Sequence, residues 1–242
     1  MARRPVDVQR YVDRLATTLC LFRLGSVSVP RYDFSAESFS MFASGSFGAP
    51  QRAPRLAYTL SKDDGPRLAR ALEILMPMLP SVFDIPQAAP NFMSAALDWY
   101  RESLFAQGPV EATVAWAVAC LEALFLGDNP NTEISFRLAQ RVIALLRCLG
   151  WNPLEVQALL KVAYDVRSKY VHGAVPKKLP HDKLQTLHRE VAECARVSCA
   201  AWIQMADKNR KEVLKTLENA LIDSDTGARL QQWCDKIELA RR

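Results

Sequence analysis

The spacing of apolar residues between positions 91 and 242 constrains the fold of this chain more than any other feature. These residues recur every three or four positions, the period of an amphipathic helix, and no stretch alternates as a strand does. Gly and Pro separate the periodic stretches, as they do at helix ends. We therefore predict an all-α helical bundle, without the fixed period of a repeat protein. Its helices are expected at about residues 91–106, 110–126, 132–150, 152–173, 182–207, 209–222 and 226–241.

Residues 1–90 are predicted to form a separate N-terminal region that is mostly helical and whose function the sequence does not reveal. Helical spacing predicts one helix over residues 6–24 and a second that opens at Asp63 or Asp64 and is ended by Pro77 and Pro80. Between them lies a stretch rich in Ser, Ala, Gly and Pro, residues 26–64, which predicts an irregular connection with room for a small hairpin. Its extended pieces are expected at residues 27–29 and 56–60. Residues 91–242 form the bundle.

Composition excludes several classes of protein. The 31 basic residues outnumber the 26 acidic ones only slightly, so a basic site must be a local cluster. Six Cys without a C-x-x-C pair and only three His predict no metal site, and we find no cofactor-binding motif, so no cofactor is expected. The N-terminus carries regularly spaced charges, unlike a signal peptide, and the most apolar run contains Glu111 and Glu122. We expect a cytoplasmic protein with reduced cysteines and no membrane span.

The segment Tyr164-Asp-Val-Arg-Ser-Lys-Tyr-Val-His-Gly173 carries the residues best suited to chemistry. Arg167 and His172 lie five positions apart at a predicted helix C-terminus, whose carbonyl groups favour a protonated imidazole. A His near neutrality can move protons to and from a ribose 2′-OH and a leaving 5′-oxygen, while a guanidinium stabilises charge on the phosphate. This pairing indicates phosphodiester chemistry without a metal ion. A basic cluster surrounds it: Lys169, Lys177 and Lys178.

Helix geometry leaves two interpretations of this segment open. Side chains five positions apart point about 140° away from each other on an ideal helix. Arg167 and His172 can therefore meet only if the helix ends between them or if two chains assemble one site. The alternative is structural, with Arg167 in a salt bridge and His172 capping the helix.

Glu122 is the second residue that we single out. Its helical neighbours three and four positions away are apolar, and a carboxylate on such a face is costly unless it is paired. A structural pair that orients an arginine is favoured over a role in proton transfer. The candidate partners are Arg137, Arg141 and Arg167.

Residues 92–222 resemble the HEPN superfamily, and specifically its Apea-like branch. The resemblance rests on Leu121-Glu122-Ala-Leu-Phe, on Glu133-Ile-Ser-Phe-Arg-Leu-Ala-Gln-Arg141-Val, and above all on the segment that ends in His172-Gly173, which matches the Arg-x(4–6)-His motif. It implies a compact helical bundle that commonly dimerises so that two motifs share one cleft. Many members are metal-independent endoribonucleases of antiviral defence or toxin–antitoxin systems. The residue after the motif Arg is often Asn, Asp or His in active members and is Ser168 here.

We therefore predict a homodimeric ribonuclease that cleaves single-stranded RNA, is restrained by a regulatory or defence-system protein and acts as a toxin or antiviral effector. Arg167 and His172 are the expected catalytic residues. Residues expected to support them are Ser168, Tyr170, Glu122 and Arg141. Residues expected to bind RNA are Lys169, Lys177 and Lys178. The alternative is a non-catalytic HEPN adaptor or effector subunit that binds a protein or RNA. A third, weaker interpretation is a helical regulator that binds a nucleotide in the dimer cleft.

Overall fold

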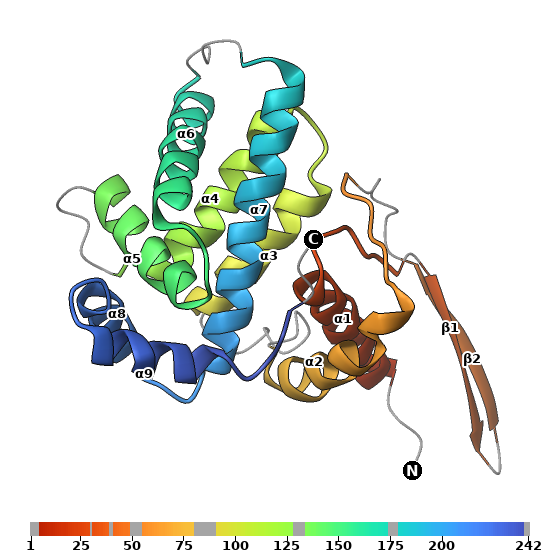
Figure 1. Cartoon of the computed structure of the whole chain (residues 1–242). Helices are drawn as coiled ribbons and strands as arrows, with labels where there is room; N and C mark the ends of the chain where they lie inside the picture. The colour runs from red at the N-terminus through yellow and green to blue at the C-terminus, as the bar shows by residue number, and fades with distance from the viewer. Residues whose placement is uncertain are drawn as a thin grey trace.

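Helices form most of the regular structure of the protein, which confirms the predicted all-α class (Figure 1). The computed structural model describes residues 5–29, 31–38, 41–48, 55–79, 91–127, 134–173 and 179–239. Its α-helices are α1 (Pro5–Phe22), α2 (Gly65–Met78), α3 (Phe92–Phe105), α4 (Val110–Phe125), α5 (Ile134–Cys148), α6 (Pro153–Val171), α7 (His181–Gln204), α8 (Arg210–Asn219) and α9 (Ser224–Cys234). A short 3-10 turn, η1 (Lys62–Asp64), precedes α2.

Local sequence signals set the ends of several helices where they were expected. The side chain of Asn91 accepts a hydrogen bond from the backbone N–H of Ser94 at 2.8 Å and caps α3. Asn152 does the same for α6, with the N–H of Leu154 at 3.0 Å. Gly173 follows α6 with φ of +68°, a conformation that glycine adopts without strain. The bounds of α6 thus match the prediction closely.

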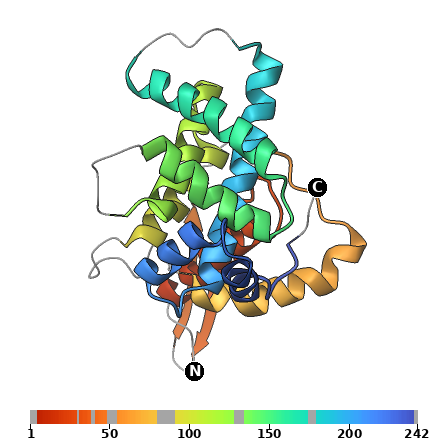
Figure 2. The same ribbon diagram turned by 60° about the vertical axis from the view of Figure 1, so that its left-hand side comes forward.

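Helix α4 lies at the centre of the bundle. It contacts α3, α5, α6 and α7, and its residues are buried on almost every side, which accounts for its strongly apolar sequence (Figures 1 and 2). It is nevertheless only 16 residues long. Among the helices that the structure describes, none is long and apolar enough to cross a membrane.

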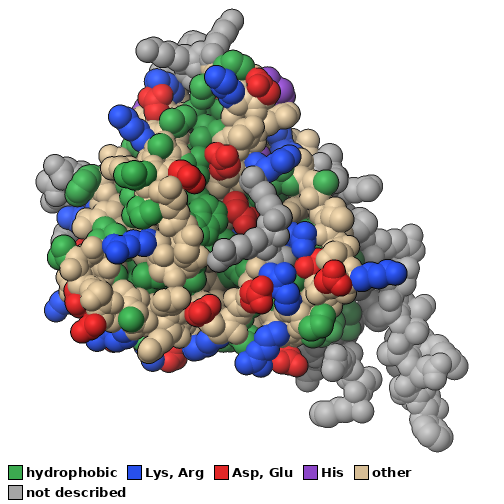
Figure 3. Space-filling model, viewed as in Figure 1, with side chains coloured by type: hydrophobic (Ala, Val, Ile, Leu, Met, Phe, Trp, Pro, Cys, Tyr) green, Lys and Arg blue, Asp and Glu red, His purple; other side chains and the backbone are tan. Residues whose placement is uncertain are grey.

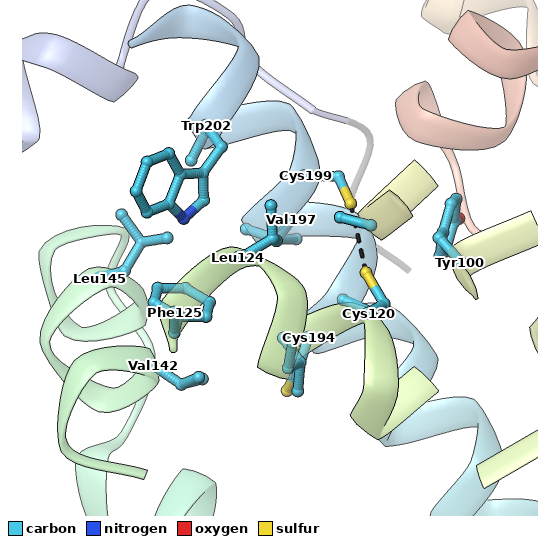
Figure 4. Packing of buried hydrophobic residues seen from close by; sticks show 14 of the residues in the cluster. Tyr100, Cys120, Leu124, Phe125, Val142, Leu145, Cys194, Val197, Cys199 and Trp202 are labelled. Atoms are coloured by element: carbon cyan, nitrogen blue, oxygen red, sulfur yellow. Dashed lines mark hydrogen bonds between the residues drawn. The ribbon is translucent and has the colours of Figure 1, made fainter. Parts of the chain in front are cut away.

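The core between α4, α5 and α7 is built from aromatic, aliphatic and cysteine side chains (Figure 4). The rings of Phe125 and Trp202 meet edge to face with their centroids 6.0 Å apart. The sulfur atoms of Cys120 and Cys199 lie 3.5 Å apart as free thiols, and burial raises the pKa of Cys120 well above its ordinary value. These cysteines pack as small apolar residues, as the sequence predicts.

Helix α1 is attached to the bundle through its C-terminal carbonyl groups. The fully buried guanidinium of Arg196 on α7 donates to the carbonyl oxygens of Leu21 at 2.6 Å and Phe22 at 2.7 Å. The hydroxyl of Tyr100 on α3 donates to the carbonyl of Cys20 at 2.8 Å. The last turn of α1 is therefore capped by side chains of the bundle. The predicted division of the chain near residue 90 stays a prediction, because residues 80–90 lie outside the described part.

The extended segments of the N-terminal region differ from those expected. Strand β1 (Arg31–Ser38) pairs with β2 (Met41–Gly48) in an antiparallel hairpin, which lies at the edge of the molecule in Figure 1. Residues 27–29 and 56–60 were the expected extended pieces, and neither is a strand. They are held near each other by the N–H of Ser26, which donates to the carbonyl of Leu56 at 2.9 Å.

The last helix is shorter than the sequence predicts. The expected helix over 226–241 ends at Cys234, and the chain continues as a strap, residues 235–239. The backbone N–H of Lys236 donates to the Gln204 side chain at 2.8 Å, and Ile237 is buried. These tertiary contacts replace the helical hydrogen bonds that local propensity favours.

Candidate functional site

Arg167 is held on the inner side of α6 by a carboxylate of α4. Its Nη2 atom lies 2.6 Å from Oε2 of Glu122, with 26% of the Arg167 side chain and 16% of the Glu122 side chain exposed. Burial raises the pKa of Glu122 above its ordinary value, and the charge of Arg167 opposes that shift. The predicted Arg–Glu122 pair is therefore present, and Arg167 is the partner among the three candidate arginines.

The aromatic ring of Tyr164 also lies near the guanidinium of Arg167. The Cζ atom of Arg167 is 5.8 Å from the ring centroid, within the range of a cation–π contact. Tyr164 precedes Arg167 by three positions, so both lie on one face of α6. The sequence pattern alone does not assign Tyr164 to the site, although its spacing of three positions from Arg167 is a usable signal. The ring and the carboxylate together fix the direction of the guanidinium.

His172 follows Val171, the last residue of α6, and the C-terminal end of this helix lies at the top of Figure 1. Its backbone N–H donates to the carbonyl of Ser168 at 3.1 Å, and its φ and ψ are −88° and 5°. The side chain is exposed. An exposed imidazole that follows the last helical turn is free to meet a substrate or a second protein molecule.

Arg167 and His172 leave α6 on different sides. Arg167 lies one heptad after the buried Leu160, whereas His172 lies one heptad after the exposed Asp165. The helix ends between them only at Val171, too late to turn the imidazole toward the guanidinium. Among the described residues, no hydrogen bond joins the two side chains. One chain therefore does not bring the two motif side chains together.

The structure describes three of the other residues expected around the motif. Lys169 pairs with Asp165 one turn earlier, at 2.5 Å, and this pair is more open to solvent than the Arg167–Glu122 pair. Ser168 is half-buried, and Tyr170 is exposed at 38%. Lys177 and Lys178 lie outside the described residues.

Arg141 belongs to another part of the molecule. It is buried, donates to the backbone carbonyl of Phe125 at the end of α4, and pairs with Glu218 of α8 at 2.5 Å. It was expected to support the motif, but these contacts direct it to the end of α4 and to α8. The reason is that its helix, α5, packs on the side of α4 where that helix ends, so the guanidinium satisfies an open carbonyl group there.

Comparison with known proteins adds no relative. No protein-family model, no curated protein and no solved structure matches the chain. The resemblance to the HEPN superfamily therefore rests on the motif residues alone.

Proposed function

We propose that the protein is a metal-independent endoribonuclease of the HEPN type, with an active site that two protomers assemble. The observation that carries the proposal is the placement of Arg167 and His172 at one end of α6 but on different sides of it. Two copies related by a two-fold axis near this end of α6 would place the guanidinium of one protomer beside the imidazole of the other. The pairing with Glu122 holds the guanidinium in a fixed direction for that approach.

The proposed reaction is an internal phosphoryl transfer. The imidazole of His172 removes the proton from a ribose 2′-OH, and the 2′-oxygen attacks the adjacent phosphorus while the bond to the 5′-oxygen breaks. The leaving 5′-oxygen is protonated by solvent, and the imidazolium of the same His172 returns its proton to solvent. Arg167 stabilises the negative charge that develops on the phosphoryl oxygens. The products carry 2′,3′-cyclic phosphate and 5′-hydroxyl ends, and all protons are accounted for without a metal ion.

Basic residues next to the motif are proposed to hold the RNA backbone. Lys169 is proposed for this role, since its partner Asp165 is largely exposed and the pair is weak in water. Lys177 and Lys178 are proposed to add charge from the segment between α6 and α7. Single-stranded RNA is the proposed substrate, because such sites follow the phosphate backbone rather than a base sequence.

The cellular role that we propose follows from the resemblance. A ribonuclease that cuts single-stranded RNA in the cytoplasm harms its own host unless a partner restrains it. We therefore propose a toxin or antiviral-defence effector controlled by a regulatory protein.

A non-catalytic HEPN module is the second candidate, and the same site carries the observation that favours it. The guanidinium of Arg167 is already engaged by Glu122 and Tyr164, which leaves about a quarter of the side chain exposed. These two contacts are sufficient to explain Arg167 as a residue that only stabilises the fold. In that case the exposed end of α6 binds a protein or RNA without cleaving it.

Cleavage of a labelled single-stranded RNA by the purified protein in EDTA distinguishes the two candidates. We expect cyclic phosphate ends and a loss of at least 10²-fold in His172→Ala. Arg167→Lys recovers little activity, because an ammonium lacks the planar pair of donors. The matched control is His181→Ala, an exposed His at the start of α7, which should cleave normally. If His172→Ala cleaves as fast as the parent, or if EDTA stops the parent, the proposed ribonuclease mechanism is wrong.

A further inference from the structure

A long groove separates α6 from α7 on the face shown in Figure 3. Its volume is about 1630 Å³, and it is walled by α6 and the end of α5 on one side, and by α7 and the strap, residues 235–239, on the other. Figure 3 shows hydrophobic side chains in a hollow at the middle of this face, with carboxylates next to them. Neither Arg167 nor His172 lines the groove. It is therefore a different surface from the proposed ribonuclease site.

The groove is larger than a typical small-ligand site. Small-molecule pockets usually measure about 300–1,000 Å³. Two of its walls are the helices α6 and α7, and apolar grooves between helices are a common way of binding an amphipathic helix of a partner. The apolar residues that reach the surface of the groove include Leu159 and Val162, above the buried Leu187 and Val197. Val162 is 42% exposed.

The charge of the groove differs in sign from that of the whole chain. Five acidic and three basic residues line it, whereas the chain carries a net charge of +5. Two of the acidic residues are paired, Glu193 with Arg196 at 2.6 Å and Glu238 with Arg67 of α2 at 3.3 Å. Glu155 and Glu190 stand on opposite walls, on α6 and α7. An apolar groove with a carboxylate on each side is complementary to an apolar helix face flanked by cations.

The walls of the groove are fixed by hydrogen bonds. Gln204 of α7 accepts from the backbone N–H of Lys236, and Arg67 of α2 donates to the carbonyl of Leu239 at 2.7 Å. These contacts hold both ends of the strap against the rest of the protein. A surface that is already ordered loses less entropy when a partner binds.

We propose that the groove between α6 and α7 binds an amphipathic helix of a partner protein, with apolar residues on one face and Lys or Arg beside them. The apolar face would occupy the hollow near Leu159 and Val162. The cations would lie next to Glu155 and Glu190. This docking surface does not depend on the ribonuclease proposal, because its residues are separate from the motif.

The test uses the full-length protein and fluorescent peptides of about 15 residues that model such a helix. The probe has Leu at positions i, i+3, i+4 and i+7, so that they share one face of the helix, and it has Lys or Arg at positions between them. One control peptide has the same composition with its leucines scattered around the helix, and the other carries Glu in place of the cations. We expect the probe to bind at least tenfold more tightly than either control peptide, as measured by fluorescence anisotropy.

Two variants on the same helix locate the binding surface. Val162→Asp should weaken binding of the probe by at least tenfold, because it places a carboxylate in the apolar hollow. Leu154→Asp is the matched control, since Leu154 is 75% exposed on α6 and does not line the groove, and it should bind the probe normally. Circular dichroism and melting temperature establish that both variants are folded.

Three results would overturn the proposal. The first is equal binding of the probe and the scattered-leucine peptide, and the second is equal binding of the probe by Val162→Asp and the parent. The third is self-association of the parent protein in light scattering that is lost in Val162→Asp and kept in Leu154→Asp. That result would assign the groove to a second copy of this chain.

Discussion

Nη2 of Arg167 and Oε2 of Glu122 lie 2.6 Å apart across the contact between α6 and α4. The pair joins the helix that ends at the motif His to the central helix of the bundle. Because the contact is partly shielded from solvent, it is worth more than an exposed ion pair and less than a fully buried one. Its role is to fix the direction of a guanidinium that still reaches solvent.

Removal of this carboxylate should destabilise the protein moderately. Glu122→Ala leaves Arg167 without its partner, and we expect a loss of about 1–3 kcal/mol in the free energy of unfolding, between the ranges for exposed and buried pairs. Glu122→Gln should cost less, because the Gln side-chain oxygen can still accept a hydrogen bond from Arg167 and because burial, which raises the pKa of Glu122, disfavours the charged carboxylate. Urea unfolding followed by circular dichroism measures both.

The control for Glu122 is the more exposed pair of Asp165 and Lys169 on the same helix. Asp165→Ala should change the free energy of unfolding by less than about 0.5 kcal/mol. Equal stability of Glu122→Ala and Asp165→Ala would show that the inner pair contributes nothing to folding.

Mixing two inactive variants tests whether the proposed ribonuclease site is shared between protomers. Arg167→Ala and His172→Ala are each expected to be inactive. In a mixed dimer, one site loses both groups and the other keeps both, so an equimolar mixture that exchanges subunits should regain about a quarter of the parental rate. RNA cleavage after mixing measures this recovery. An active parent whose mixed variants stay inactive after subunit exchange would mean that each chain supplies both groups to its own site.

The buried Arg196 should be essential for the attachment of α1. Arg196→Met fills similar space but removes the donors to Leu21 and Phe22 and leaves Glu193 without its cation. We expect a loss of about 3–5 kcal/mol in the free energy of unfolding. The exposed pair of Arg70 and Glu73 supplies the control, and Arg70→Ala should be nearly neutral. Equal melting temperatures of the two variants would contradict this account of α1.

His188 should make the protein less stable in mild acid. It is buried on α7 with Nε2 2.8 Å from the Ser103 carbonyl, and burial lowers its pKa from 6.5 to about 4. As the pH falls, His188 therefore takes up a proton in the unfolded state before it does so in the folded state. Its contribution to the free energy of unfolding is complete above pH 6.5 and decreases as the pH drops toward 4, by about 3 kcal/mol in total. The stability of His188→Gln, which keeps an N–H donor but does not titrate, should fall less over this range.

The difference between parent and variant is the quantity to measure for His188, because carboxylates titrate over the same pH range in both proteins. Parallel stability curves for the parent and His188→Gln would contradict the lowered pKa. The control variant is His181→Gln, on the exposed start of the same helix.

The sequence predicted one contact of the candidate site and not its assembly. Glu122 stands among apolar neighbours and therefore required a cation, but Arg137, Arg141 and Arg167 all met that requirement in the sequence. The packing of α5 chose between them, since it brings Arg141 to the end of α4 and to Glu218. Likewise, the 140° angle between Arg167 and His172 follows from helix geometry. The structure adds that α6 continues to Val171, so the helix does not end early enough to bring the two side chains together.

By itself, the sequence determined the class of fold, most helix boundaries and the need of Glu122 for a partner. These features depend on local rules: the period of apolar residues, capping by Asn91 and Asn152, and the freedom of Gly173. The tertiary structure alone decided the end of α9 at Cys234, the attachment of α1 through Arg196 and the groove between α6 and α7. Each of these depends on contacts between residues distant in sequence, whose energies override the preferences of a single segment.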